Sequence, residues 1–183
     1  DIKLDGVRLL SFLDQTTAVT QYTRNGKQNE NFTEIVAALE LVKAELPASF
    51  VFDGEVVSTS FQDLMTQIGR KGSTKDTSSA RLALFDMIPL RDFNSGKCAI
   101  SQADRHKMLA EVAPLLQEKT QGLVYVVPKV PVDLDTPEGQ DDFKNFNKEA
   151  IEAGYEGVMI KDPRAPYETK RTASWLKVKP WIE

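Results

Sequence analysis

The stretch Phe50–Val57 constrains the fold of this chain more than any other part of the sequence. Aromatic and β-branched residues at both ends predict a strand, but Asp53-Gly54-Glu55 places two carboxylates inside it. An unpaired charge is costly to bury, so these charges need the rim of a site, a partner or a ligand. The stretch therefore predicts a strand that contributes to the core and to a polar site.

Two stretches near the C-terminus have the same character. Glu156–Lys161 begins with a carboxylate and a glycine, continues as an apolar strand and ends with a lysine. In Trp175–Lys179 the residues alternate, which places Lys177 and Lys179 on one face of a strand. Two lysines on one face repel each other unless an anion such as a phosphate lies between them. Taken singly, each stretch is equally explained by a half-exposed strand.

The N-terminal residues Lys3-Leu4-Asp5-Gly6-Val7-Arg8 gather a second set of reactive groups. A lysine whose pKa is lowered by burial or by cationic neighbours becomes a neutral amine and a nucleophile. Asp5 is placed to orient that amine, and Gly6 leaves room for a phosphate or a base beside the backbone. Arg8 offers a planar fork for phosphate or ribose oxygens. A turn at a strand edge with solvated charges explains the same residues.

The chain as a whole reads as a mixture of strands and helices. The β-rich runs predict strands at Val7–Leu13, Ala18–Thr23, Phe50–Val57, Ala80–Ile88, Leu123–Val127, Tyr155–Lys161 and Ser174–Lys179. Apolar residues at helical spacing predict a helix over Phe32–Pro47, and Ser60–Ile68 is a candidate short helix before the polar loop Gly69–Ser79. Because the strands do not alternate strictly with helices, we expect an α+β fold with mostly antiparallel sheets flanked by helices.

Two further helices have recognisable starts. Ser101 with Asp104 three residues later predicts an N-cap and a helix through Glu118. Thr136-Pro137 predicts the N-cap and first residue of a helix that ends before Gly154. His106, between Arg105 and Lys107, is expected on a solvated face. The second helix is expected to turn Phe143, Phe146, Ala150 and Ile151 to the core.

The composition limits the classes of protein and of site. The chain has 183 residues, which fits one domain with a sizeable core. No apolar run approaches the roughly 18 residues of a membrane span, and no signal peptide is visible. The one cysteine, Cys98, and the one histidine, His106, exclude an internal disulfide and a thiolate or multi-histidine metal site. A metal here should be a hard cation such as magnesium. The net charge of −4 argues mildly against a nucleic-acid partner.

The reactive stretches occur together in a particular order. They are Lys3-x-Asp5-Gly6-x-Arg8, Arg24-Asn25-Gly26, Asp53-Gly54-Glu55, Phe85-Asp86, Glu156-Gly157 and Lys177-x-Lys179. This series resembles motifs I, Ia, III, IIIa, IV and V of the adenylation (nucleotidyltransferase) domain of ATP-dependent DNA ligases. The resemblance covers nearly the whole chain, and six ordered matches are far more specific than a lone K-x-D-G.

The resemblance implies a catalytic set. Lys3 would attack the α-phosphate of ATP and form a lysyl-AMP phosphoramidate with release of pyrophosphate, a covalent route that divides a difficult transfer into two steps. Asp5 would position this lysine and later approach the 3′-hydroxyl of a nick. Lys177 and Lys179 would neutralise the charge that grows on the α-phosphate.

The resemblance also implies the residues that bind ATP and the nick. Arg8 and Arg24 would contact the ribose or the 5′-phosphate of the nick. Phe85 would stack on adenine, and Asp1 or the backbone of Ile2 would read the edge of the base.

The resemblance also implies two carboxylates that bind the ribose or a metal, and duplex DNA as the substrate. Glu55 would hold the ribose hydroxyls or Mg²⁺, and Glu156 would bind Mg²⁺. AMP would then pass to the 5′-phosphate of nicked double-stranded DNA, and the 3′-hydroxyl would displace it to seal the nick. Because duplex DNA is held through its phosphates, binding should weaken with salt.

Members of this family normally carry a segment before the nucleophile and an OB-fold domain after motif V. We therefore expect residues 1–183 to be the core of a larger ligase that acts as a monomer in the cytoplasm, or in the nucleus of a eukaryote. Capping guanylyltransferases, RNA ligases and NAD-dependent ligases share much of the motif series and remain alternatives. A non-catalytic nucleotide- or DNA-binding module that keeps the fold is the alternative from another class.

Overall fold

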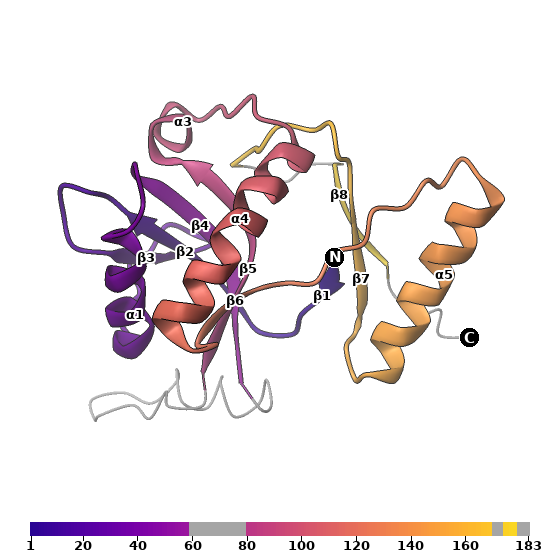
Figure 1. Ribbon diagram of the computed structural model, residues 1–183, viewed down its shortest axis with the longest axis horizontal. Coiled ribbons are helices and arrows are strands. Elements are labelled where there is room, and N and C mark those ends of the chain that lie inside the picture. The colour runs from indigo at the N-terminus through magenta and orange to yellow at the C-terminus, as the bar shows by residue number, and fades with distance from the viewer. Residues whose placement is uncertain (59–79, 170–173, 179–183) are drawn as a thin grey trace.

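The structure is a computed structural model that describes residues 1–58, 80–169 and 174–178. Its strands form two separate sheets (Figure 1). The larger sheet has the order β3-β2-β4-β5-β6, with the strands β2 (Val7–Leu13), β3 (Thr20–Thr23), β4 (Phe50–Val57), β5 (Arg81–Pro89) and β6 (Val124–Val126). The smaller sheet has the order β1-β7-β8, with β1 (Ile2–Lys3), β7 (Gly157–Lys161) and β8 (Trp175–Val178).

The larger sheet is built on strands with a period of two. In β2, Leu9 and Leu13 are fully buried, whereas Arg8, Leu10 and Phe12 point to the other face and are half-buried. Strand β4 pairs antiparallel with both β2 and β5, and its register with β5 shifts between Asp53 and Gly54. One face of the sheet therefore supplies a core, and the opposite face is less buried and carries Arg8 beside apolar side chains.

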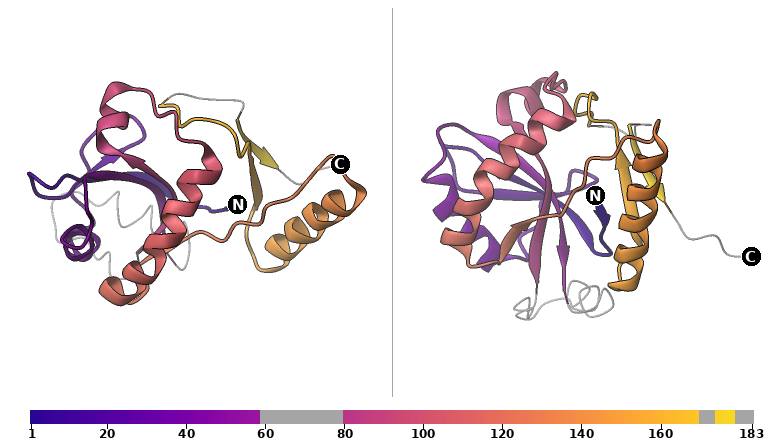
Figure 2. Two further views of the ribbon diagram at one scale, coloured as in Figure 1. Left: turned by 45° about the horizontal axis from the view of Figure 1, so that its top comes forward. Right: turned by 45° about the vertical axis from the view of Figure 1, so that its right-hand side comes forward.

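Two helices cover the apolar face of the larger sheet (Figures 1 and 2). They are α1 (Thr33–Lys43) and α4 (Gln102–Thr120). Their apolar residues Leu39 and Leu109 join Leu9, Phe52 and Leu84 in one buried cluster. Burial of these side chains is the main apolar stabilisation of this half of the molecule.

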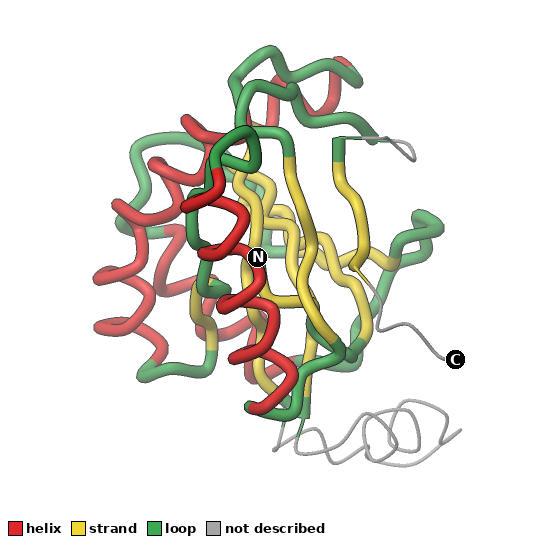
Figure 3. The backbone as a smooth tube through the Cα atoms, turned by 90° about the vertical axis from the view of Figure 1, so that its right-hand side faces the viewer, coloured by secondary structure: helices red, strands yellow, loops and turns green. Residues whose placement is uncertain are grey.

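The smaller sheet carries the helix α5 (Pro137–Glu152) on the side that faces away from the larger sheet (Figures 1 and 2). Seen from that side, α5 lies in front of the strands (Figure 3). Strands β1 and β8 both pair antiparallel with β7, so the N-terminal residues lie beside a strand more than 150 positions later in the chain. The two sheets, one from each part of the molecule, face a shared cavity.

The structure confirms the α+β fold and most of the predicted elements. Ser101 caps α4 by accepting a hydrogen bond from the amide of Asp104 at 3.2 Å. Thr136 caps α5 by accepting from the amide of Gly139 at 3.0 Å. The predicted helix Ser60–Ile68 and loop Gly69–Ser79 lie outside the described residues. No helix in the described ranges is both long and apolar enough to cross a membrane.

The sheets are mostly antiparallel, as expected, with β5 and β6 paired in parallel; the short helix α3 (Leu90–Ser95) was not predicted, because it has too few residues to show a period. Two other predictions need correction. Ile151 is 43% exposed, so it does not join the core face of α5. The face of α4 around His106 is only partly solvated: Lys107 is exposed, but the imidazole is half-buried and its neighbour Arg105 is fully buried.

Candidate active site

A cavity of about 550 Å³ lies between the two sheets. Both sheets contribute to its lining, and most of the predicted site residues meet there. The predicted residues on its walls are Asp1, Ile2, Lys3, Asp5, Arg8, Arg24, Glu55, Phe85, Glu156 and Lys177. Lys179 lies outside the described residues. Positions from residue 1 to residue 177 thus converge on one cavity.

Lys3 is placed by the pairing of β1 with β7. The register sets Lys3 opposite Gly157, and the Nζ of Lys3 forms an ion pair with the carboxylate of Glu156. The lysine side chain is 15% exposed, whereas that of Glu156 is half-exposed at the mouth. The amine is therefore largely removed from water and has a carboxylate in contact.

The glycines next to these groups are required by the approach of neighbouring strands. A Cβ on Gly157 would lie 2.7 Å from the carbonyl oxygen of Val178, and its φ of 148° also favours glycine. A Cβ on Gly6 would lie 2.2 Å from the carbonyl oxygen of Val56. The backbone of β4 thus fills the side of Gly6 on which a side chain would stand, while Gly6 itself still lines the cavity.

Glu55 lies opposite Arg8 in the pairing of β2 with β4. Burial raises the pKa of Glu55 to about 7, although the positive charges of Lys3 and Arg8 act in the opposite direction. This carboxyl group therefore changes its charge near neutral pH.

Arg8 has a fixed partner within the fold. Its Nε and Nη2 donate to the two carboxylate oxygens of Asp53 at 3.0 and 2.5 Å, and the hydroxyl of Tyr167 donates to the same carboxylate at 2.7 Å. Asp53 is fully buried. Burial lowers the pKa of Arg8, but the Asp53 carboxylate more than reverses this and raises it. The fork that was predicted to face ribose or phosphate is thus bound to Asp53.

Phe85 lies in a cluster of aromatic and cationic groups. Its ring is 5.6 Å from that of Trp175 in an edge-to-face arrangement. The Nζ of Lys161 lies 4.5 Å from the centre of the Phe85 ring and 4.3 Å from that of Trp175. The Arg8 guanidinium is 5.5 Å from the Phe85 ring. Such cation–π contacts stabilise positive charge beside the rings.

The Asp1 carboxylate joins two buried lysines. It accepts from Lys161 at 2.5 Å and pairs with Lys129 at 3.4 Å. Lys129 also donates to the carbonyl of Phe85 at 3.1 Å. Burial lowers the pKa of Lys129 to about 7 and that of Lys161 to about 8. Asp1 is therefore tied to the backbone beside Phe85, at the end of the cavity where it was expected to read the base.

Sequence reasoning gave no role to several residues of this site. Lys161 and Trp175 line the cavity, together with Met159. The Asp53 carboxylate binds Arg8, and the Tyr167 hydroxyl donates to the same carboxylate. The signal for Asp53 was present, because a carboxylate inside an apolar strand needs a partner. Tyr167 carries no comparable local signal.

The carboxylates of the cavity suit a cation that is also bound by substrate phosphates, rather than a metal site made of protein ligands alone. In the described ranges, no group of three or more His, Cys, Asp or Glu side chains converges in a way that could hold a metal ion. Glu55 and Glu156 both line the cavity. Mg²⁺ is commonly bound by one or two carboxylates together with substrate phosphates, so this donor set fits it.

The comparisons with known proteins agree with this geometry. A family model described as ATP dependent DNA ligase domain matches residues 1–179. The DNA ligase of Halobacterium salinarum is 28% identical over 197 residues, covering 100% of this chain and 32% of the ligase. A probable DNA ligase of Streptomyces griseus is 30% identical and is covered over 35% of its length. The chain thus spans about a third of the length of the curated relatives it matches.

Solved structures agree in fold. The protein Pmar-Lig_Pre superposes with a TM-score of 0.89 at 46% identity, covering 100% of this chain and 42% of that one. The ATP-dependent DNA ligase of bacteriophage T7, solved in complex with ATP, gives a TM-score of 0.69 at 22% identity over 98% of this chain and 61% of that one. The second match speaks for the fold alone. On the match over residues 1–179 and the likeness in sequence, this chain belongs to the ATP-dependent DNA ligase family, as its adenylation domain.

Proposed function

We propose that this domain takes AMP from ATP onto Lys3 and passes it to the 5′-phosphate of nicked duplex DNA. The observation that carries the proposal is the convergence of Lys3, Glu55, Glu156 and Lys177 on one cavity that Phe85 also lines. A lysine nucleophile, carboxylates and a further lysine are the groups that phosphoryl transfer requires, because its catalysis depends on positioning and on charge stabilisation.

The first step is attack of the Lys3 amine on the α-phosphorus. The amine must be neutral, and the Glu156 carboxylate in contact with Nζ supports its role as the acceptor of the proton. The new bond joins nitrogen to phosphorus, and the bond to pyrophosphate breaks. Lys177, on the same cavity wall, would stabilise the negative charge on the phosphate oxygens.

The base and ribose would lie deeper in the cavity. Phe85 offers a ring for adenine, and Asp1 lies within the same cluster through Lys161 and Lys129. Arg8, bound to Asp53, keeps a fixed orientation and supplies positive charge to the cavity beside Glu55. When bound with ATP, Mg²⁺ would be held by Glu55 and Glu156 and would neutralise phosphate charge.

Transfer to DNA would follow at the open side of the cavity. An oxygen of the 5′-phosphate attacks the AMP phosphorus, the bond to Lys3 breaks, and the lysine regains its proton. The 3′-hydroxyl then attacks the 5′-phosphate and loses its proton, and AMP leaves. Asp5 and Arg24 are exposed at the mouth. A second cavity, of about 750 Å³, also reaches Arg24 and Lys177, which supports a phosphate path over this face.

The experiment is the intact mass of the protein after incubation with ATP and Mg²⁺. We expect a gain of one AMP that pyrophosphate reverses. Lys3→Ala should abolish the gain, and Lys27→Ala, at an exposed lysine of the turn after β3, should leave it unchanged. A protein that gains no AMP in its complete form would contradict the proposal and would favour a non-catalytic binding module.

Donor and substrate distinguish the enzymatic alternatives. An RNA ligase of Naegleria gruberi gives a TM-score of 0.55 at 13% identity, which speaks for the fold alone. We expect ATP to charge the protein and GTP and NAD not to. We further propose that nick sealing needs a domain beyond residues 1–183, since the matched relatives are about three times as long. Full turnover on nicked DNA by residues 1–183 would contradict that part.

A further inference from the structure

The walls of the cavity belong to different sheets, so some contact must hold the small sheet in place against the large one. Lys3 and Lys177 lie in the small sheet, whereas Glu55 and Phe85 lie in the large one. ATP that contacts all four would be held only while both walls keep their spacing. The segment after β7, residues 162–169, leaves the small sheet and reaches the large one (Figure 1).

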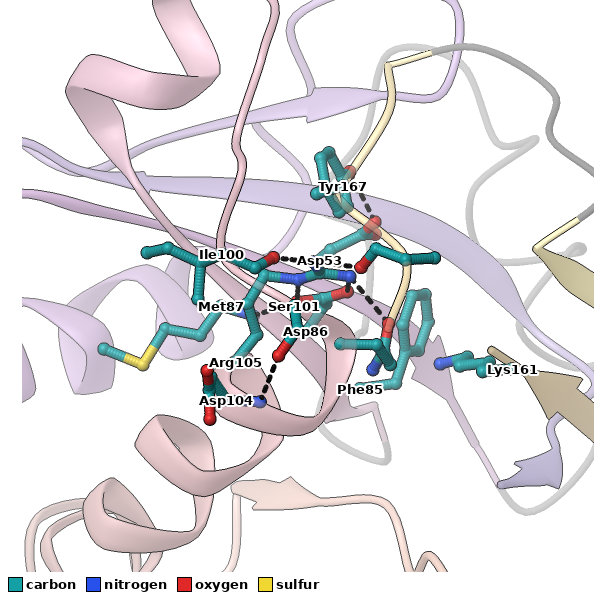
Figure 4. A network of polar contacts seen from close by, with 12 residues as sticks. Asp53, Phe85, Asp86, Met87, Ile100, Ser101, Asp104, Arg105, Lys161 and Tyr167 are labelled. Atoms are coloured by element: carbon teal, nitrogen blue, oxygen red, sulfur yellow. Dashed lines mark hydrogen bonds and ion pairs between the residues drawn. The ribbon is translucent and has the colours of Figure 1, made fainter. Parts of the chain in front are cut away.

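Arg105, in the first turn of α4, is fully buried in this region. Its Nε and Nη2 donate to the two oxygens of the Asp86 carboxylate at 2.8 and 3.2 Å, and Nη2 also donates to Gln102 at 2.7 Å (Figure 4). Asp86 is itself buried and directly follows Phe85 on β5. The guanidinium is therefore anchored to the large sheet next to a wall residue of the cavity.

The same guanidinium holds the segment from the small sheet. Its Nη1 donates to the carbonyl of Ala165 at 3.1 Å and to that of Ile100 at 2.5 Å. The first amides of α4 hold the segment too: Gln102 donates to Ala165 and Ala103 donates to Pro163, both at 2.9 Å. The start of α4 thus binds the segment through side-chain and backbone donors that a helix leaves free at its N-terminus.

From this segment the contacts lead back to the cavity. The Tyr167 amide donates to the carbonyl of Cys98 at 3.2 Å, and the guanidinium of Arg105 lies 5.6 Å from the Tyr167 ring. The Tyr167 hydroxyl donates to Asp53, which holds Arg8. Figure 4 shows Tyr167 and Asp53 above the guanidinium of Arg105, and Phe85 and Lys161 to its lower right.

We propose that Arg105 is a positioning residue for the nucleotide reaction: by joining Asp86 to Ala165 it fixes the small sheet against the large one. We call Arg105, Asp86, Ala165 and Tyr167 the inter-sheet clamp. This inference rests on the proposed function. An arginine suits the task because its planar group has five donors in fixed directions, which a lysine ammonium does not reproduce.

The clamp predicts a particular kinetic signature. Without it, the arrangement that can bind ATP becomes a fraction of the population, and the apparent affinity falls by that fraction. Saturating ATP restores the arrangement, because the nucleotide contacts both walls. The half-saturating ATP concentration should therefore rise while the limiting rate of lysyl-AMP formation stays nearly constant. A residue needed for stability alone would reduce the amount of active protein and leave the half-saturating concentration unchanged.

The test uses two variants of the complete gene product. Arg105→Lys keeps the charge beside Asp86 but loses the forked geometry. Arg105→Met combined with Asp86→Asn removes both charges, so that no buried charge is left unpaired and the protein can fold. The matched control is Arg81→Met, on the same strand as Asp86, where the exposed arginine donates to the carbonyl of Gly122. Circular dichroism checks that each variant is folded.

Two measurements are made on each variant. Single-turnover formation of lysyl-AMP at varied ATP should give a half-saturating concentration at least about tenfold higher for both clamp variants, with limiting rates within about threefold of the unsubstituted protein. Hydrogen exchange should be at least about tenfold faster at the amides of Gln102, Ala103 and Tyr167. The control should match the unsubstituted protein in both.

Each outcome of these measurements either supports or overturns the clamp. Unchanged exchange, or an unchanged half-saturating concentration in a folded clamp variant, overturns the clamp while the proposed function stands. Failure of the unsubstituted protein to form lysyl-AMP overturns the proposed function, and the clamp's role falls with it.

Discussion

Each of the two sheets of this molecule is held in place by a different kind of contact. The large sheet packs fully buried apolar side chains such as Leu9, Phe52 and Leu84 against two helices. The small sheet has little of this: Leu176 in β8 is 52% exposed, and in β7 only Gly157 and Val158 are buried. Polar contacts help to position it, from Lys129 to Asp1 and to the carbonyl of Phe85 and from Arg105 to Ala165, beside a small apolar cluster in which Trp175 of β8 packs against Ile88 and Tyr167. The wall that carries the nucleophile therefore depends more on directional contacts than the wall behind it does.

The largest difference in unfolding free energy between the two regions should come from a substitution in the core of the large sheet. Phe52→Ala removes a fully buried ring and should lower the free energy of unfolding by about 3–5 kcal/mol. Leu176→Ala, in the half-exposed strand β8, should change it by about 0.5 kcal/mol or less. Urea denaturation measures both. Equal losses in the two variants would contradict the contrast between the sheets.

A smaller effect should follow from one polar contact between the regions. Tyr167→Phe removes the hydroxyl that donates to the fully buried Asp53 carboxylate, and should cost about 2 kcal/mol of unfolding free energy. Tyr155→Phe is the matched control, since that side chain is 41% exposed. If urea denaturation finds the two variants equal, the Tyr167 contact does not hold the small sheet's segment.

The smallest effect is a dependence on pH at the cavity. The pKa of Glu55 is raised by burial from 4.5 to about 7, so the folded state binds its proton more tightly than the unfolded chain does. The contribution to stability is complete below pH 4.5 and is lost as the pH rises through 7. Glu55→Gln should therefore gain about 1 kcal/mol over the unsubstituted protein between pH 5 and pH 6. Urea denaturation at the two pH values checks this, and an equal difference at both would refute the shifted pKa.

Local patterns in the sequence predicted much of the fold. β2 and β4 occur with the predicted bounds, because each strand is marked by an apolar run of consecutive residues. The caps of α4 and α5 were equally readable, since each cap involves residues three positions apart.

The contacts that sequence reasoning missed depend on partners far away in the sequence. Arg105 has the appearance of a surface residue until Asp86, 19 positions earlier, and Ala165, 60 positions later, enclose it. The ligand contact expected of Arg8 stays a prediction, but the carboxylate that binds its guanidinium comes from a strand 45 positions away. Such pairings follow from the tertiary arrangement of the sheets, which the local pattern does not contain.

The crowded glycines have a consequence for screening sequences. Gly6 and Gly157 stand next to candidate catalytic residues, yet each is demanded by the carbonyl oxygen of an adjacent strand. A descendant that had lost all chemistry would still need both, as long as it kept the two sheets. A motif search that rewards the glycines therefore detects the architecture, and only the side chains at positions such as Lys3 distinguish a working enzyme from an inert copy.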